Sequence, residues 1–423
     1  MSDPAWIDAA LTAARPQAVA ALLRYFRDLD AAEEAFQNAC LRALRTWPEK
    51  GPPRDPVAWL IFVGRNSGID MVRKKSRETV LPDEDRISDL SDAEADMAER
   101  LDAADYRDDI LRLMFTCCHP DLPATQQIAL ALRIVSGLSV RRIASAFLVG
   151  ESAMEQRITR AKARIARAGI PFSTPGAVER SERLASVAAM VYLVFNEGYS
   201  ATGENFAERG ALCNEAIRLA RLLLRLFPTE PEIMGLAALC LIQHSRTPAR
   251  HDPDGQIVLL EDQDRSRWNA KMIAEGLVLV DKAMRHRAPG PYQIQAAVAA
   301  LHARAKTPDE TDWVQIDLLY SALEAHQPSP VVTLNRAVAH ARAYGPEAGL
   351  AMVDPLGGQL DGYFHFHGVR GALLMQAGRE TDARAAFDRA IALANSTAEA
   401  AHIRSQIDRL AGEARAARAK ATA

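Results

Sequence analysis

The sequence predicts an all-α protein made of two small helical modules followed by a long helical repeat domain. Apolar residues recur at helical spacing along most of the chain, in stretches rich in Ala and Leu that end at Gly or Pro. No segment shows a convincing alternation of apolar and polar residues, the pattern of half-buried strands. With 423 residues the chain is longer than one hydrophobic core usually supports, so several domains are expected.

Composition narrows the classes of function. The chain is 48% hydrophobic and 25% charged, and no apolar run is long enough to cross a bilayer. The amino terminus lacks the basic and apolar regions of a signal peptide, and the five cysteines are scattered, so a reducing cytoplasm is expected. The net charge of -3 means that any binding to nucleic acid depends on local separation of charge.

Charge divides the chain into modules. Twelve acidic residues stand against three basic ones from Asp83 to Asp109, which predicts an acidic linker over residues 81–105. A basic run, Arg73 to Arg77, precedes the linker, and five basic residues face two acidic ones between Glu151 and Ala168. The predicted order is a first module over 1–80, the linker, a second module over 106–170 and a helical extension over 176–423.

The first module contains a helix suited to melted DNA. Asp55 is an N-cap residue and is followed by Pro at the first helical position, so a helix should run to about Lys75. Aromatic, amide, acidic and basic residues then fall on neighbouring parts of one face: Trp59, Phe62, Asn66, Asp70, Arg73 and Lys74. Rings stack on unpaired bases, and amides and cations bind base edges and phosphates. The alternative is that Trp59 and Phe62 belong to the core.

An earlier helix of this module is amphipathic. Its apolar stripe is predicted to be Phe36, Cys40, Leu44 and Trp47. The remaining faces carry Asp30, Glu33, Glu34, Gln37 and Asn38. Two interpretations stay open: a face that only meets solvent, or one that docks on a basic coiled coil of a partner.

The second module reads as a helix-turn-helix. Two supporting helices come first, and then a short helix from Val140 to Phe147, a tight turn and a basic helix beginning near Ser152. The predicted buried stripe of the basic helix is Met154, Ile158, Ala161 and Ile165. Side chains placed to reach base edges are Ser152, Glu155, Gln156, Thr159 and Arg160, and those placed near phosphates include Arg141, Arg142, Arg157, Lys162 and Arg164. A basic amphipathic helix of an unrelated bundle is the alternative.

The extension shows a repeat. The segments from Asn335 to Ala351 and from Val369 to Ala385 match at an offset of roughly 34 residues, the tetratricopeptide period. Small residues at matching positions would let paired helices pack closely. Residues 292–305 and 313–326 are expected to form an earlier pair.

Several of these segments resemble extracytoplasmic-function sigma factors. Residues 30–39, 58–60 and 65–73 resemble the second domain of that family, and residues 138–144 and 154–161 resemble its fourth domain. Residues 115–120, 195–199 and 259–268 are similar to the subgroup with a tetratricopeptide-like carboxy-terminal extension. Glu155 stands where many relatives have a basic residue.

The resemblance implies partners and roles. Core RNA polymerase would be bound through the clamp helices of β′ and the flap of β, with the polar face of residues 30–42 on the clamp. Asn66, Asp70 and Arg73 would lie at the minus-ten element, and residues 152–160 would read the minus-thirty-five element. Apart from the resemblance, the concave surface of a tetratricopeptide stack usually holds another protein segment, so the extension is expected to bind the chain's own modules or another protein. Two competing interpretations stay open: a helix-turn-helix regulator with a tetratricopeptide interaction domain, and a tetratricopeptide scaffold that contains a basic helix only incidentally.

No catalytic residue, cofactor or metal is expected. Cys117, Cys118 and His119 are adjacent in sequence, but neighbouring cysteines on a helix point in different directions and no second ligand pair follows. The charged segment from Glu261 to Arg267 is interpreted as a loop held by internal ion pairs, with a ligand or partner site as the alternative.

Overall fold

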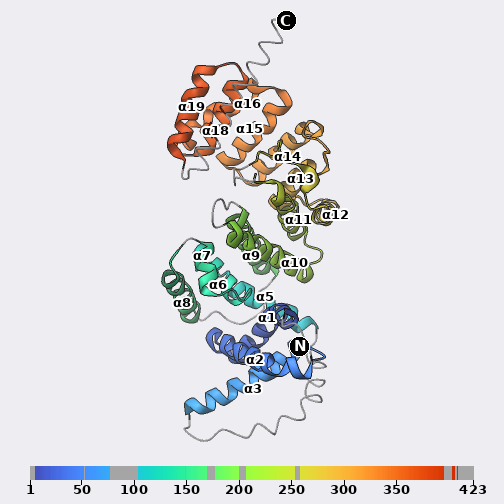
Figure 1. Cartoon of the computed structure of the whole chain (residues 1–423), viewed down its shortest axis with the longest axis vertical. Coiled ribbons are helices and arrows are strands. Elements are labelled where there is room, and N and C mark those ends of the chain that lie inside the picture. The colour runs from blue at the N-terminus through green and yellow to red at the C-terminus, as the bar shows by residue number, and fades with distance from the viewer. Residues whose placement is uncertain are drawn as a thin grey trace. The chain divides into compact units, whose positions relative to one another are not determined.

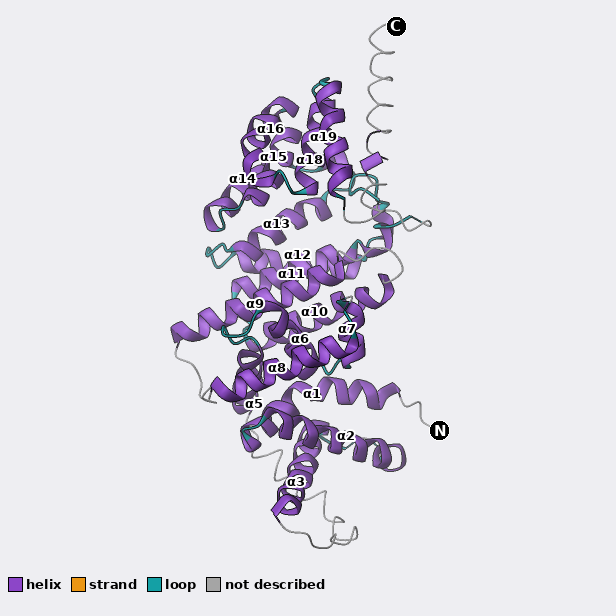
Figure 2. Cartoon of the chain, turned by 90° about the vertical axis from the view of Figure 1, so that its left-hand side faces the viewer, coloured by secondary structure: helices purple, strands orange, loops and turns teal. Residues whose placement is uncertain are grey.

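The computed structural model describes residues 5–51, 53–76, 103–147, 149–168, 177–199, 206–252, 258–394, 403–404 and 407. Within these ranges the regular structure is helical and contains no β-strand, as Figure 2 shows. The predicted all-α class is therefore confirmed. The acidic linker predicted over 81–105 lies almost entirely outside the described residues. No helix among those described combines the length and the hydropathy that crossing a bilayer requires.

The chain folds as two compact units, and Figure 1 follows their helices in order. The first unit contains residues 1–198 together with 208–215, and the second contains 199–207 and 216–423. The division therefore falls after α9, whereas the sequence suggested a boundary near residue 176. The helices of the first unit are α1 (Ala5–Phe26), α2 (Leu29–Lys50), α3 (Pro56–Ser76), α5 (Ala103–Cys117), α6 (Ala124–Ile134), α7 (Val140–Ala146), α8 (Glu151–Ala168) and α9 (Ala177–Tyr199), the last ending at the boundary.

Helices α1, α2 and α3 pack on one another around an aromatic cluster. The Trp47 ring stacks on Trp6 at 6.0 Å between centroids and meets the edge of Trp59 at 5.3 Å. The side chain of Asp28 caps α2 by accepting a hydrogen bond from the Ala31 amide at 2.7 Å. Asp55 caps α3 by accepting from the amides of residues 57 and 58, so the predicted start of this helix is confirmed.

Helices α5 to α8 form the second module of this unit. The predicted short helix and the longer basic helix are present as α7 and α8, which pack on each other and on α6. Ser139 caps α7 by accepting from the Arg142 amide at 3.2 Å. Asp109, counted in the acidic stretch, lies in α5, where it is 1% exposed and pairs with Arg24 and Arg112. Asp109 therefore belongs to the buried part of this unit and not to the linker.

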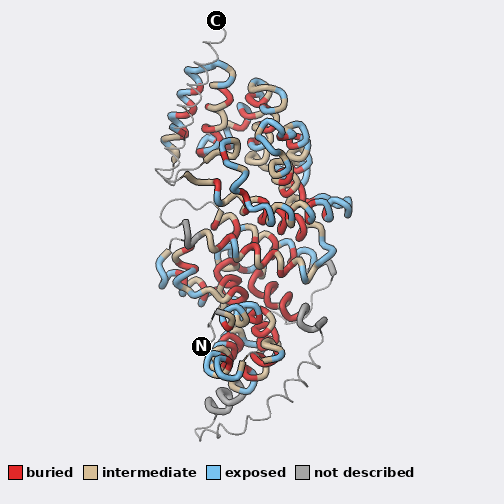
Figure 3. The backbone as a smooth tube through the Cα atoms, turned by 45° about the vertical axis from the view of Figure 1, so that its right-hand side comes forward, coloured by how far each residue is buried: buried red, intermediate tan, exposed pale blue. Residues whose placement is uncertain are grey.

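The second unit is a series of helices. Helix α10 (Phe206–Leu226) contributes to both units. The helices that follow are α11 (Pro231–Ser245), α12 (Ala270–Met284), α13 (Pro291–Arg304), α14 (Trp313–His326), α15 (Pro330–Tyr344), α16 (Pro346–Val353), α17 (Gly357–Leu360), α18 (Phe364–Gln376) and α19 (Glu380–Leu393). Each helix from α11 to α16 packs on the next one, α18 packs on both α16 and α19, and α11 also packs on α13. Figure 3 shows buried residues recurring along these helices.

Small residues permit close packing at the positions that the repeat predicted. Gly349 in α16 and Ala383 in α19 are buried at an offset of 34 residues. A Cβ placed on Gly371 of α18 would lie 2.8 Å from the Phe387 ring of α19. At Gly235 of α11 the backbone of another helix comes close, since a Cβ would lie 2.5 Å from the backbone nitrogen of Gln293 in α13. The helix bounds expected for 292–305 and 313–326 match α13 and α14 within one residue.

The charged segment before α12 contacts two other helices. Arg265 donates hydrogen bonds to the carbonyls of His302 and Ala305, each at 2.6 Å. Glu261 pairs with Arg342 of α15. These contacts join the segment to the carboxy-terminal end of α13 and to α15, and ion pairs within the segment stay a prediction.

Candidate nucleic-acid interface

Helix α8 presents a polar face opposite its buried stripe. Met154, Ile158 and Ala161 are buried, while Ile165 is only half-buried at the less covered end of the helix. The predicted base-reading side chains are therefore accessible: Ser152, Glu155, Gln156, Thr159 and Arg160 are all exposed. Arg141 and Arg142 on α7 are exposed as well, and Arg157 is half-buried. The two helices together form an accessible surface with an excess of basic groups.

The predicted strip on α3 is only partly accessible. Trp59 is 7% exposed and packs against Trp47, so the alternative that it belongs to the core is the correct one. This part of α3 is enclosed on most sides, since Ala58, Leu60 and Ile61 are buried too. The Phe62 side chain is half-buried, and that of Asn66 is exposed. The side chains of Asp70, Arg73 and Lys74 lie outside the described residues.

The polar face of α2 differs from the prediction at two positions. Asp30, Glu34 and Gln37 are exposed and Asn38 is half-buried, but Glu33 is 4% exposed and is not part of the accessible face. Leu44, expected in the apolar stripe, is 51% exposed.

Leu41 is 57% exposed and lies four residues after Gln37 and three before Leu44, so all three share one face of the helix. Sequence reasoning missed these two leucines as surface residues. The sequence did hold a signal: Leu41 and Leu44 follow Glu34 by seven and ten residues, a spacing that puts all three on one face of a helix. The accessible α2 face is therefore Asp30, Glu34, Gln37, Leu41 and Leu44.

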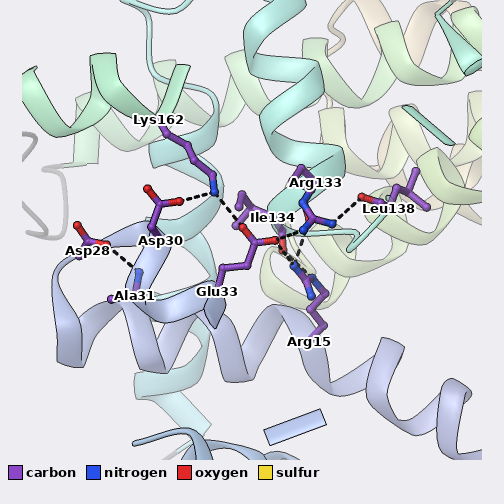
Figure 4. Close-up of polar contacts among 9 residues, drawn as sticks. All are labelled: Arg15, Asp28, Asp30, Ala31, Glu33, Arg133, Ile134, Leu138 and Lys162. Atoms are coloured by element: carbon purple, nitrogen blue, oxygen red, sulfur yellow. Dashed lines mark hydrogen bonds and ion pairs between the residues drawn. The ribbon is translucent and has the colours of Figure 1, made fainter. Parts of the chain in front are cut away.

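Glu33 lies at the centre of an ion-pair cluster that joins the two modules of the first unit (Figure 4). Its carboxylate lies 3.3 Å from Arg15 of α1, 3.0 Å from Arg133 of α6 and 3.0 Å from Lys162 of α8. Lys162 also donates to Asp30 at 2.6 Å. We refer to Arg15, Asp30, Glu33, Arg133 and Lys162 as the Glu33 cluster.

Hydrogen bonds to the backbone extend this cluster. Arg15 donates to the carbonyls of Ile134 at 3.0 Å and of Arg133 at 3.2 Å, near the end of α6. Burial lowers the pKa of the Arg15 guanidinium, and the charge of Glu33 opposes that shift. Burial alone would likewise lower the pKa of the Lys162 ammonium, but its hydrogen bonds and charge interactions with Asp30 and Glu33 raise it overall. Lys162 is therefore a cation at neutral pH, and a guanidinium such as that of Arg15 keeps its proton in proteins.

The two adjacent cysteines are buried thiols in the core of the second module. Burial raises the pKa of Cys117 well above its usual value and that of Cys118 to about 12. Across the described part of the chain, no group of three or more His, Cys, Asp or Glu side chains is arranged to hold a metal ion.

Comparison with known proteins assigns the modules. Residues 11–78 match sigma-70 region 2, and residues 112–165 match sigma-70 region 4. The matched segments include α2, α3, α7 and α8. The chain belongs to the extracytoplasmic-function sigma factors. A sigma factor binds RNA polymerase and DNA, and its family regulates transcription.

The carboxy-terminal extension has a family of its own. Residues 183–284 match a family of unknown function, DUF6596. A protein of Rhizobium meliloti (strain 1021) described as uncharacterized is 70% identical over 413 residues, which cover 98% of each chain. No solved structure matches the chain.

Proposed function

We propose that this sigma factor directs promoter-specific initiation by reading the minus-thirty-five element with α8 and the minus-ten element with α3 from Asn66 onward. The observation that carries the proposal is the division of α8 into a buried stripe and an exposed polar face. Gln156 and Arg160 can reach base edges from that face, and Arg141 lies where a phosphate contact needs a cation. On α3, Asn66 is exposed, and Asp70, Arg73 and Lys74 follow it along the helix.

The core polymerase would bind the accessible α2 face. A face that carries two exposed leucines beside Glu34 and Gln37 suits a partner that buries apolar surface and supplies cations at the rim. The clamp helices of β′ are the proposed partner, and the flap of β would hold the second module. Leu41 and Leu44 thus join the residues that the sequence singled out for this contact.

We also propose that the extension modulates activity. It includes a cavity of about 750 Å³ between helices α13, α14, α15 and α18, lined by both apolar and charged side chains. Trp313 and Arg342 line it, with the guanidinium stacked over the ring at 5.6 Å. A cavity of this kind is suited to binding a segment of another protein or of the chain itself. Truncation after Gly169 keeps both matched sigma regions and should alter promoter-specific transcription.

The deciding experiment is reconstitution. Purified full-length chain is added to core RNA polymerase, and transcripts are measured on promoters mapped after overexpression. Promoter-dependent transcripts that require both components would support the proposal. Binding to promoter DNA without any affinity for core would instead support a helix-turn-helix regulator with an interaction domain.

A further inference from the structure

The charged segment before α12 forms part of the wall of another, smaller cavity in the extension. This cavity of about 210 Å³ is also lined by residues of α11, α13 and α14. Leu260 and Trp268 belong to the segment. Arg246 directly follows α11, and His302 lies near the end of α13. At about 30 Å³ for each water molecule the cavity would hold about seven waters, so its size suits a small molecule and not a peptide or a helix.

The polar side chains that line this cavity offer hydrogen-bond donors. An arginine guanidinium and a tryptophan indole only donate, and the amides of Gln243 and Gln295 donate as well as accept. Among the described residues that line the cavity there is no Asp or Glu. A wall that carries a guanidinium and several N–H groups, without a carboxylate, is suited to an anion.

The remaining wall of the cavity is apolar. Ile242, Leu260 and Val298 contribute to it, together with two alanines of α13 and the ring of Tyr320. An inorganic anion would leave this surface without an apolar partner, whereas the carbon skeleton of an organic acid can cover it. The lining therefore favours a carboxylate that is joined to a small apolar body.

Three buried N–H groups in and beside the cavity have no hydrogen-bond acceptor among the described residues. They are Nε1 of Trp268, which is 6% exposed, and Nε of both Arg246 and Arg265. The Arg265 guanidinium lies over the Trp268 ring at 4.9 Å from its centroid, so these two side chains are in contact. Most buried donors in folded proteins are paired. A carboxylate in the cavity would supply oxygen atoms that accept hydrogen bonds where acceptors are lacking.

The same two arginines are held by neutral groups. Arg246 donates to the hydroxyl of Tyr199 at 2.7 Å, and Arg265 donates to two backbone carbonyls at the end of α13 at 2.6 Å. Neither guanidinium forms an ion pair with a carboxylate in the described part of the chain. Their positive charge is therefore not balanced by a direct partner.

The titration of nearby groups reflects this excess of positive charge. Burial and the charge of Arg246 lower the pKa of the Arg265 guanidinium, and the charge of Glu310 only partly opposes the shift. Burial, and then the charges of Arg246 and Arg265, lower the pKa of His302 to about 4. The His302 ring is therefore neutral at pH 7 and can donate one hydrogen bond without adding charge.

We propose that this cavity binds a small organic acid, whose carboxylate accepts hydrogen bonds from Trp268 and Arg246 and whose apolar body packs against Ile242 and Val298. Arg265 positions the Trp268 ring by stacking on it, and its hydrogen bonds fasten the segment to α13. The bound carboxylate balances the charge of the two arginines. Binding here is independent of the proposed function, since neither polymerase nor DNA takes part in it.

The test is an NMR titration of the full-length chain, labelled at its tryptophans with a nitrogen isotope. The chain has five tryptophans, and each contributes one indole N–H signal. Trp268→Phe keeps an aromatic ring and removes the donor, so it identifies the signal of Trp268. The probes are benzoate and the smaller isobutyrate. Each is compared with its neutral amide, benzamide or isobutyramide, which has nearly the same shape but no charge.

We expect both carboxylates to shift the Trp268 signal and to bind at least about tenfold more tightly than the amides, because hydrogen bonds to a charged acceptor are about twice as strong. Arg246→Gln should raise the dissociation constant for benzoate by about tenfold or more. The matched control is Arg370→Gln, which should leave it unchanged. Arg370 is half-buried in α18, pairs with Asp354 and does not line this cavity.

Three outcomes would contradict the proposal. A Trp268 signal that neither carboxylate moves at about 10 mM would overturn the site. Amides that bind as tightly as the carboxylates would show that the cavity does not select an anion. Inorganic phosphate that binds as tightly as benzoate would refute the assignment to an organic acid. These three comparisons use the wild-type chain, so they decide the proposal even if Arg246→Gln does not fold.

Discussion

Truncating the two exposed leucines of α2 should weaken binding to core polymerase without affecting the fold. Full burial of a leucine side chain stabilises a complex by about 1.5–3 kcal/mol. Leu41 is 57% exposed and Leu44 is 51% exposed, so roughly half of each side chain is available to a partner. The two together can contribute on the order of 2 kcal/mol, and alanine retains part of this. Leu41→Ala combined with Leu44→Ala should therefore raise the dissociation constant by roughly 10- to 30-fold.

The assay is a titration of fluorescently labelled chain with core polymerase at fixed salt concentration. Leu318→Ala in α14 is the matched control, since Leu318 is 63% exposed but lies in the extension. Thermal unfolding should be almost unchanged for all variants, because substitutions at exposed positions rarely alter stability by more than about 0.5 kcal/mol. An affinity of the double variant within twofold of wild type, with the control also unchanged, would refute the assignment of this face to the polymerase.

Three further changes test other parts of the molecule. Gln156→Ala should relax the preference for one base pair of the upstream element by about 1–3 kcal/mol. Arg141→Ala should lower transcription from all promoters of a panel nearly equally, because a phosphate contact carries no sequence information. A loss at selected promoters from Arg141→Ala would contradict this division. Gly235→Ala should destabilise the chain by about 1–3 kcal/mol in thermal unfolding, because the added methyl group overpacks against α13. The control Gly210→Ala should be neutral or slightly stabilising, because a Cβ there meets nothing within 4 Å. Equal stability of the two variants would argue against the close approach at Gly235. Burial, with two nearby arginines, lowers the pKa of His302 from 6.5 to about 4. As the pH falls, the unfolded chain therefore takes up this proton before the folded chain does, and stability should decrease between about pH 6.5 and about pH 4. His302→Gln should flatten this pH dependence in unfolding curves, and an unchanged slope would contradict the shift.

Local sequence signals were sufficient for the bounds of several helices, including α3, α7, α13 and α14. Asp55 followed by Pro predicted where α3 begins, because an N-cap side chain and a ring with fixed φ act within a few residues. The start of α7 at Ser139 followed from the same chemistry. Gly349 and Ala383, which the 34-residue offset relates, are both buried, as expected for small residues at which helices pack closely.

Positions on the faces of α2 and α3 were harder to predict. Helical periodicity shows which residues share a face, but not how many neighbours cover the helix. Trp59 is buried because α3 packs on both α1 and α2, so a strip that looked like a ligand surface is partly core. Leu44 is exposed although it continues an apolar stripe, because no described helix covers that side of α2.

The amino-acid sequence by itself determined the all-α class, the order of the modules, the family and the polar face of α8, since each depends on residues close together in the chain. Only the tertiary structure decided the environment of Glu33. Its partners Arg133 and Lys162 stand 100 and 129 positions away in the sequence, and no local pattern relates them. The sequence placed this carboxylate on a polar face of its helix, but the structure buries it because two modules pack together around it. The free energy of a charge depends on the groups that surround it in space, and these come from distant parts of the chain.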